Sequence, residues 1–153
     1  MDGVIFMGMY KALDIAKYIV TKCVKDGNPI SNLQLQKMLY FVQINFIKNL
    51  GQPAFQEEME AWRLGPVIPV VYRIFMLEGS SKILRTFPEV IDKIDKTHRK
   101  LIDMIIEECI KLTPWQLVAR THKEGTPWKQ YYKQGKKKTI PNESVMKYVM
   151  ELK

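Results

Sequence analysis

The chain has 153 residues, of which 46% are hydrophobic and 26% are charged, and these proportions exclude a largely disordered protein. A domain of this size buries about 70% of the surface of its unfolded chain, so its core needs neither a metal nor a disulfide. The net charge is +8, and seven basic residues against one acidic residue between positions 120 and 138 contribute +6 of it.

The cysteines and the N-terminus indicate the cellular compartment of the protein. Cys23 and Cys109 are far apart in the sequence and lie among aliphatic residues, which predicts reduced core thiols. No apolar stretch approaches the ~20 residues that cross a bilayer, and the apolar run near the start is too short for a signal peptide. We therefore expect a cytoplasmic protein without a membrane partner, with an N-terminal extension over residues 1–9 and one domain over residues 10–153.

The first half of the domain is predicted to begin with two helices. Residues 10–25 carry apolar side chains at helical spacing with lysines between them, which predicts an amphipathic helix. Ser31 and Gln34 have the spacing of a capping box, and Gly51 is typical of the residue that follows a helix, so a second helix is predicted between them. Three polar residues are predicted on the wetter side of this helix: Gln36, Lys37 and Gln43.

The segment Glu60–Tyr72 interleaves two prolines and one glycine with Trp, Tyr and aliphatic residues. Gly65-Pro66 is predicted to end the preceding element, and Pro69 suits the first turn of a helix that runs to Leu77. Residues 52–62 are predicted to be coil with some strand. A further short strand is predicted over residues 82–87, and its pairing with residues 57–62 would form a small hairpin.

The second half is predicted to be helical throughout. Residues 89–111 carry the longest apolar stripe at helical spacing. Threonine followed by proline predicts helix starts at Thr113 and Thr126, and another helix follows Pro141 after a loop over residues 135–138. The sequence therefore predicts a mainly α, compact single-domain fold of about six helices with at most a small β-hairpin.

Residues capable of catalysis do not form a recognisable constellation. His98 lies on the apolar stripe of the predicted long helix, which is typical of a hydrogen-bonded core histidine. Glu57, Glu58 and Glu60 lack an opposing second acid and are interpreted as solvated. The cysteines and histidines lack the close pairs of a zinc site, and nucleotide-binding and hydrolase motifs are absent. We therefore expect no enzymatic activity, metal or cofactor.

The C-terminal third holds two candidate binding features. His122 follows a predicted helix and precedes a glycine, so it either bonds the terminal carbonyls of that helix or has a binding role. Residues 128–138 interleave aromatic rings with cations, which suits nucleic acid, an acidic protein, or a solvated face over a partly buried Trp128 and Tyr131. The candidate basic patch consists of Lys129, Lys133, Lys136, Lys137 and Lys138.

Three segments in order, residues 30–43, 60–72 and 121–128, resemble the Panacea family of phage-associated, SocA-like antitoxin proteins. The resemblance runs from about Leu13 to Trp128, and a C-terminal helix is also typical of the family. Seventeen positions match the family pattern: Leu35, Gln36, Lys37, Leu39, Tyr40, Gln43, Ala61, Trp62, Gly65, Pro66, Val67, Pro69, Tyr72, His122, Gly125, Pro127 and Trp128.

This resemblance implies a mostly helical antitoxin of a toxin-antitoxin pair, often carried by prophages, that neutralises a cognate protein toxin by direct binding. One type of member also delivers its toxin to a protease, so a protease is a second implied partner. Two features depart from the pattern: Val42 replaces a common small residue, and the segment after the third helix is mildly basic where relatives are often acidic. Because interfaces discriminate by charge, the resemblance does not transfer the choice of toxin.

The residue patterns and the resemblance together predict a rigid corner. Trp62, Gly65-Pro66 and Pro69 are expected to set this corner against the second helix, with residues 122–128 closing the same region. The candidate partner-binding residues are Tyr40, Gln43, Arg63, Tyr72, His122 and Trp128, and exposed parts of the first four are expected to contribute to the toxin-binding surface. The alternative function is a phage-encoded nucleic-acid-binding regulatory protein that uses residues 128–138.

Overall fold

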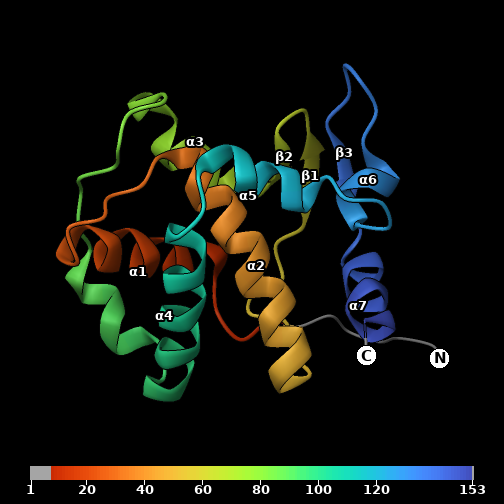
Figure 1. Ribbon diagram of the computed structural model, residues 1–153. Coiled ribbons are helices and arrows are strands. Elements are labelled where there is room, and N and C mark those ends of the chain that lie inside the picture. The colour runs from red at the N-terminus through yellow and green to blue at the C-terminus, as the bar shows by residue number, and fades with distance from the viewer. Residues whose placement is uncertain (1–7, 153) are drawn as a thin grey trace.

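The fold is mainly helical, as predicted. A computed structural model describes residues 8–152 and contains seven α-helices, two short 3-10 helices and one three-stranded sheet in that range (Figure 1). The predicted extension over residues 1–9 falls largely outside the described residues. The elements are α1 (Ala12–Lys25), α2 (Asn32–Leu50), β1 (Met59–Trp62), β2 (Gly65–Val67), α3 (Pro69–Phe75), η1 (Met76–Glu78), η2 (Pro88–Lys93), α4 (Lys96–Ile110), α5 (Pro114–Thr121), α6 (Pro127–Tyr131), β3 (Lys138–Ile140) and α7 (Asn142–Glu151).

Helix α2 is the central element of the fold. It contacts α1, α3, α4, α5, α7 and β2, and Figure 1 shows it running through the middle of the molecule. The predicted capping box is confirmed, because Ser31 Oγ accepts from the Gln34 N–H while Gln34 Oε1 accepts from the Ser31 N–H. Gly51 ends the helix in the left-handed conformation, as predicted.

The polar residues of α2 are buried, so the prediction that Gln36, Lys37 and Gln43 lie on a wetter side was wrong. Gln43 Nε2 donates to the Phe55 carbonyl at 2.7 Å, and its Oε1 accepts from the Ala54 N–H at 2.8 Å and the Phe55 N–H at 3.2 Å. The long irregular segment after α2 has backbone groups that need partners in the interior, and these side chains supply them.

The same pattern continues towards the start of α2. Lys37 Nζ donates to the Pro66 carbonyl, Gln36 Oε1 accepts from the Ile68 N–H, and Asn32 Nδ2 donates to the Tyr72 carbonyl. As positions on α2 rise from 32 to 43, their partner residues run backwards from 72 to 54. The segment therefore runs antiparallel to α2 and is bound to it along its length. We call Asn32, Gln36, Lys37 and Gln43 the polar row of α2.

The hairpin lies at a different place from the one predicted. β1 pairs with β2 through a two-residue turn at Arg63 and Leu64, and β3 adds to the other edge of β1, both antiparallel. The predicted strand over residues 82–87 was wrong: Lys82 forms an isolated bridge with Ser31, residues 83–87 have no regular structure, and the Ile83 N–H donates to the Ile30 carbonyl. A two-residue turn closes a much shorter loop than the predicted pairing, which lowers its entropic cost.

The predicted long helix over residues 89–111 is broken. The 3-10 helix η2 ends at Lys93, Ile94 is extended and buried, and α4 starts after Asp95. The Asp95 carboxylate accepts from the Thr97 N–H at 2.9 Å, which makes it a helix cap. The helical spacing of apolar residues in the sequence does not reveal this break, because Ile94 is buried in the core although it lies between the two helices. The predicted helix starts at Thr113 and Thr126 are confirmed by their side-chain caps.

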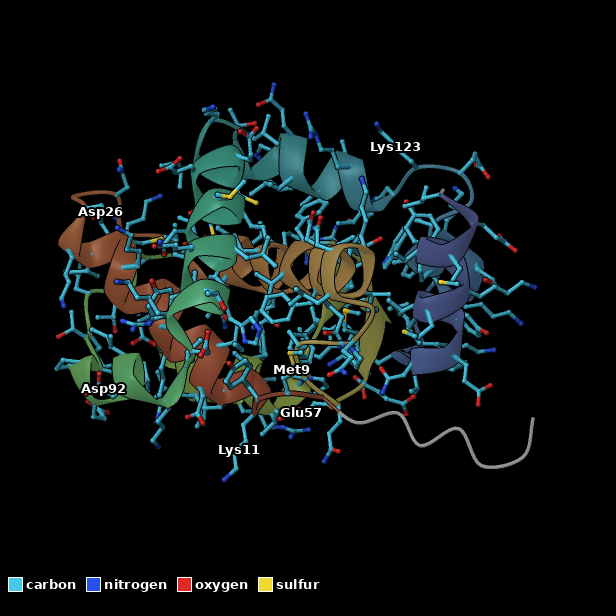
Figure 2. All side chains as sticks on the ribbon, turned by 90° about the horizontal axis from the view of Figure 1, so that it is seen from below. Met9, Lys11, Asp26, Glu57, Asp92 and Lys123 are labelled. Carbon is cyan, nitrogen blue, oxygen red and sulfur yellow. The ribbon has the colours of Figure 1, made fainter. Side chains whose placement is uncertain are left out.

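Two of the glutamates interpreted as solvated, the half-buried Glu57 and the exposed Glu58, also cap helices. Glu57 Oε2 accepts from the Ala12 N–H at the start of α1, and Glu58 Oε2 accepts from the Asn142 N–H at the start of α7, both at 2.9 Å. Figure 2 shows Glu57 beside Met9, just before α1. A carboxylate at a helix N-terminus meets both unsatisfied N–H groups and a favourable dipole, so these acids are structural.

The remaining core predictions agree with the structure. His98 Nδ1 lies 2.6 Å from the Tyr10 hydroxyl, which confirms a hydrogen-bonded histidine against the core. Cys23 and Cys109 are both buried and not disulfide-bonded, as predicted. None of the helices within residues 8–152 is long and apolar enough to span a bilayer.

We expect Gln43→Leu to lower the free energy of unfolding by roughly 3 kcal/mol, because three buried backbone groups at Ala54 and Phe55 lose their partner. Urea denaturation followed by circular dichroism measures this change. The matched control is Gln52→Leu at an exposed position nearby, which should change the stability by less than about 0.5 kcal/mol. Equal effects of the two substitutions would contradict the role of the polar row.

Candidate partner-binding site

The three segments that carry the resemblance meet at one corner of the molecule. The His122 ring stacks on the Trp128 ring with centroids 3.5 Å apart and planes within 3°, and Tyr132 stacks against Trp128 at 4.6 Å. Trp128 Nε1 donates to the Trp62 carbonyl at 2.6 Å, which ties α6 to β1. The prediction that residues 122–128 close the corner is therefore confirmed.

Trp62 connects this corner to α3 and to the basic loop. Its ring packs edge-on against Tyr72 with centroids 4.8 Å apart, and its Nε1 donates to Glu60 at 2.8 Å. Lys137 Nζ lies 4.1 Å from the centroid of the Trp62 ring, within the range of a cation–π contact. Figure 1 shows the β1–β2 turn and the loop before β3 projecting on the same side of the molecule as α3.

A cleft of about 480 Å³ lies between the start of α2, the β1–β2 turn, α3 and the start of α5. Its walls are mainly apolar and include Leu33, Trp62, Tyr72 and Trp115, while Arg63 stands at its edge. Trp115 is 65% exposed, which is unusual for so large an apolar side chain. We call this space the corner cleft.

Lys37 contributes to the inner wall of the corner cleft and is fully buried. Its ammonium has three donors but makes one hydrogen bond among the described residues, to the Pro66 carbonyl at 2.9 Å. Burial disfavours the charged form and lowers the pKa of Lys37 from its ordinary 10.5 to about 7. Protonation of this side chain therefore changes near neutral pH.

Gly65 allows Lys37 and α5 to approach the hairpin. Its φ is +118°, and a Cβ at this position would lie 2.5 Å from Lys37 Cε and 2.8 Å from Thr121 Oγ1. Both distances are well inside van der Waals contact, so any larger residue would force the side chains of Lys37 and Thr121 to move, and the positive φ would strain its backbone. The glycine therefore acts as a packing requirement, beyond the chain-breaking role predicted from the sequence.

His122 does not bond the helix carbonyls as one interpretation proposed. Its side chain makes no hydrogen bond within residues 8–152, and its Nε2 is buried without a partner there. Burial lowers the pKa of His122, and the cations of Lys37 and Lys129 lower it further. The imidazole is thus held neutral and serves mainly as a flat surface on which Trp128 packs.

Three of the candidate partner-binding residues, Tyr40, Gln43 and Trp128, are not at the surface. Tyr40 is 2% exposed with its phenol near that of Tyr148, and Gln43 is fully buried, so the expectation that parts of both are exposed was wrong. Both lie further along α2, where it is covered by α7 and by residues 54–55. Arg63 is exposed and Tyr72 half-buried, and both line the corner cleft.

The structure adds an apolar surface that the sequence analysis missed. Val70, Ile74 and Leu77 are exposed along α3 and η1, and Leu77 is 93% exposed. Their spacing of four and three residues places them on one side of the helical segment, a signal present in the sequence. An exposed apolar stripe of this kind marks an interaction surface. Together with the corner cleft we call it the corner surface.

The basic patch is divided between different environments. All five lysines are exposed, but Lys129 lies 3.7 Å from Glu124 and Lys137 covers the Trp62 ring. Trp128 is only 5% exposed and lies between the rings of His122 and Tyr132, so it has no open face for a nucleic-acid base. Within residues 8–152 no group of three His, Cys, Asp or Glu side chains is arranged to hold a metal ion.

Comparisons with known proteins found a family model and a relative that match much of the chain. A family model described as "Antitoxin SocA-like, Panacea domain" matches residues 35–129, more than half of the chain. The chain is also similar to Antitoxin SocA of Caulobacter vibrioides, with 32% identity over 124 residues. The matched region covers 74% of this chain and 66% of that protein, slightly less than two thirds of its length. No solved structure matches the chain.

We expect the stability of the protein relative to its Lys37→Met variant to rise between pH 7 and 8.5. The pKa of Lys37 is lowered to about 7 on folding, so in this window the unfolded chain binds more protons and each pH unit favours the wild type by up to about 1.4 kcal/mol. Below pH 7 the full cost of the buried charge is present. Urea denaturation of both proteins at several pH values measures the difference, and parallel stability curves would contradict it.

Proposed function

Because the chain belongs to the Antitoxin SocA-like, Panacea domain family, we propose that it is an antitoxin that neutralises a cognate protein toxin by direct binding through the corner surface. The observation that carries the proposal is the open, mainly apolar cleft at the corner where the family-like segments meet. Helix α3, whose Tyr72 lines this cleft, and η1 also expose an apolar stripe. Such a surface is costly to leave in water unless a partner covers it.

The composition of the corner surface supports a protein partner. Trp, Tyr and Arg are the residue types that contribute most to binding at protein interfaces, and the corner cleft presents Trp62, Trp115, Tyr72 and Arg63. The surface also rests on rigid elements, because the polar row binds residues 54–72 to α2. A preformed surface loses little conformational entropy on binding, which favours affinity.

A second pocket, of about 420 Å³, lies between α2, α4 and α5, but it is a weaker candidate. It is lined by Phe41, Met104 and Leu117 together with both acidic and basic residues, including Glu108 and Arg120. Neither Trp62 nor Tyr72 is among its lining residues. The proposal therefore places the toxin at the corner surface.

We expect the product of the adjacent gene to be toxic when expressed alone and harmless when co-expressed with this protein. Arg63→Glu and Leu77→Asp change exposed side chains of the corner surface, so each should weaken the complex by about tenfold or more without unfolding the antitoxin. Growth assays and calorimetric titration of the purified pair measure the two effects.

The matched control is Lys100→Glu, an exposed cation on α4 that does not line the corner cleft. This charge reversal should leave both growth and affinity unchanged. Toxicity that persists on co-expression would refute the antitoxin function. A complex equally sensitive to Lys100→Glu and Arg63→Glu would instead move the interface away from the corner surface.

A further inference from the structure

The corner cleft is cationic as well as apolar. Arg63 stands at its edge, Lys37 lies in its inner wall, and Lys137 covers the neighbouring Trp62 ring. No acidic residue lines the cleft among the described residues, and Arg63 makes no ion pair within residues 8–152. The nearest acid along the chain, Glu60, already accepts a hydrogen bond from Trp62. A positive cleft of this kind favours a negatively charged occupant.

We propose that the corner cleft binds an acidic peptide segment of the protein partner, in which a carboxylate side chain meets Arg63 and a neighbouring aliphatic or aromatic side chain enters between Trp62, Tyr72 and Trp115. The identification of this partner with a toxin rests on the function proposed above. The acidic and apolar chemistry of the segment follows from the cleft itself.

Lys37 supplies the inner wall with an ammonium whose charged form a bound carboxylate would stabilise. Its ammonium is fully buried and uses one of three donors, on the Pro66 carbonyl. A carboxylate brought into the cleft would favour the charged form of Lys37, because opposite charges at short range stabilise each other more strongly in a desolvated site. The cost of burying this lysine is then recovered in the bound state.

The apolar walls of the cleft require that the occupant also carry an apolar side chain. A volume of about 480 Å³ lies within the range of ligand pockets, about 300 to 1,000 Å³, and suits a few large side chains. Trp115 at 65% exposure and the half-buried Tyr72 offer apolar area that a second side chain can cover. An isolated anion would leave this area in water, so the complementary occupant carries both kinds of group.

Nucleic acid fits the cleft less well than an acidic peptide. Stacking along a strand needs several open aromatic faces, but Trp128 is buried between two rings and Trp62 is approached by Lys137 and Tyr72. Of the tryptophans, this leaves Trp115 as the exposed ring at the cleft. The exposed lysines of the basic patch at 133, 136 and 138 do not line the cleft. The two basic residues that line the cleft, Lys37 and Arg63, therefore suit one or two carboxylates rather than a run of phosphates.

Selection from a random dodecapeptide library displayed on phage tests this proposal without knowledge of the toxin. The full-length protein should enrich peptides with Asp or Glu within two positions of Leu, Ile, Phe or Trp. A synthetic peptide of the enriched sequence, titrated by fluorescence anisotropy, should bind about tenfold or more weakly when its acids are replaced by the matching amides. Arg63→Glu and Trp115→Ala should weaken it similarly, because both side chains are exposed and line the cleft.

Lys100→Glu serves again as the matched charge reversal and should leave peptide affinity unchanged. Absence of enrichment, or enriched peptides that bind Arg63→Glu as well as wild type, would overturn the proposal. A random single-stranded DNA whose binding falls with Arg63→Glu, in the absence of any peptide selection, would assign the cleft to nucleic acid. An acidic peptide consensus without neutralisation of the adjacent gene product would keep the cleft assignment and remove the antitoxin function.

Discussion

The polar row of α2 is the constraint on which the rest of the structure depends. Residues 52–68 connect the central helix to α3 mostly without regular structure, so their buried backbone groups require partners from elsewhere. Asn32, Gln36, Lys37 and Gln43 supply these partners from one helix, in an order that makes the segment run antiparallel to it. The hairpin, the start of α3 and thus the corner cleft take their positions from these bonds.

This arrangement requires a lysine and a glycine to share a small space. The Lys37 side chain passes so close to Gly65 that a Cβ there would displace it, and its Nζ donates to the Pro66 carbonyl. Burying an ammonium with one hydrogen bond is expensive, and a well-packed apolar residue would fill the same volume at lower cost. The position of Lys37 beside the cleft, where a bound carboxylate would stabilise its charge, offers a physical reason for its presence.

The residues that match the family pattern and those proposed to contact a partner overlap only in part, at positions such as Trp62 and Tyr72. Gln36, Lys37, Gln43, Gly65 and Trp128 are buried and hold the corner together, whereas Val70, Ile74, Leu77 and Trp115 are exposed around it and lie outside the pattern. Interfaces select partners through exposed shape and charge, while a core fixes the fold. A shared framework with variable exposed residues would let related proteins bind different toxins from the same corner.

The sequence by itself determined the local structure, because its signals act over a few residues. The helices are specified by caps at Ser31, Thr113 and Thr126, by proline at the start of α3 and α6, and by apolar spacing. The same spacing placed His98 against the core and predicted the buried cysteines.

The partners of long-range bonds were decided only in the tertiary structure. Polar residues on α2 look solvated in a helical pattern, yet Gln43 and Tyr40 are buried, because the segments that cover them are distant in sequence. The strand predicted at residues 82–87 does not form, and β1 pairs with β2 through a two-residue turn instead. Glu57 and Glu58 cap helices whose first residues are distant in sequence, so only the tertiary structure places them there.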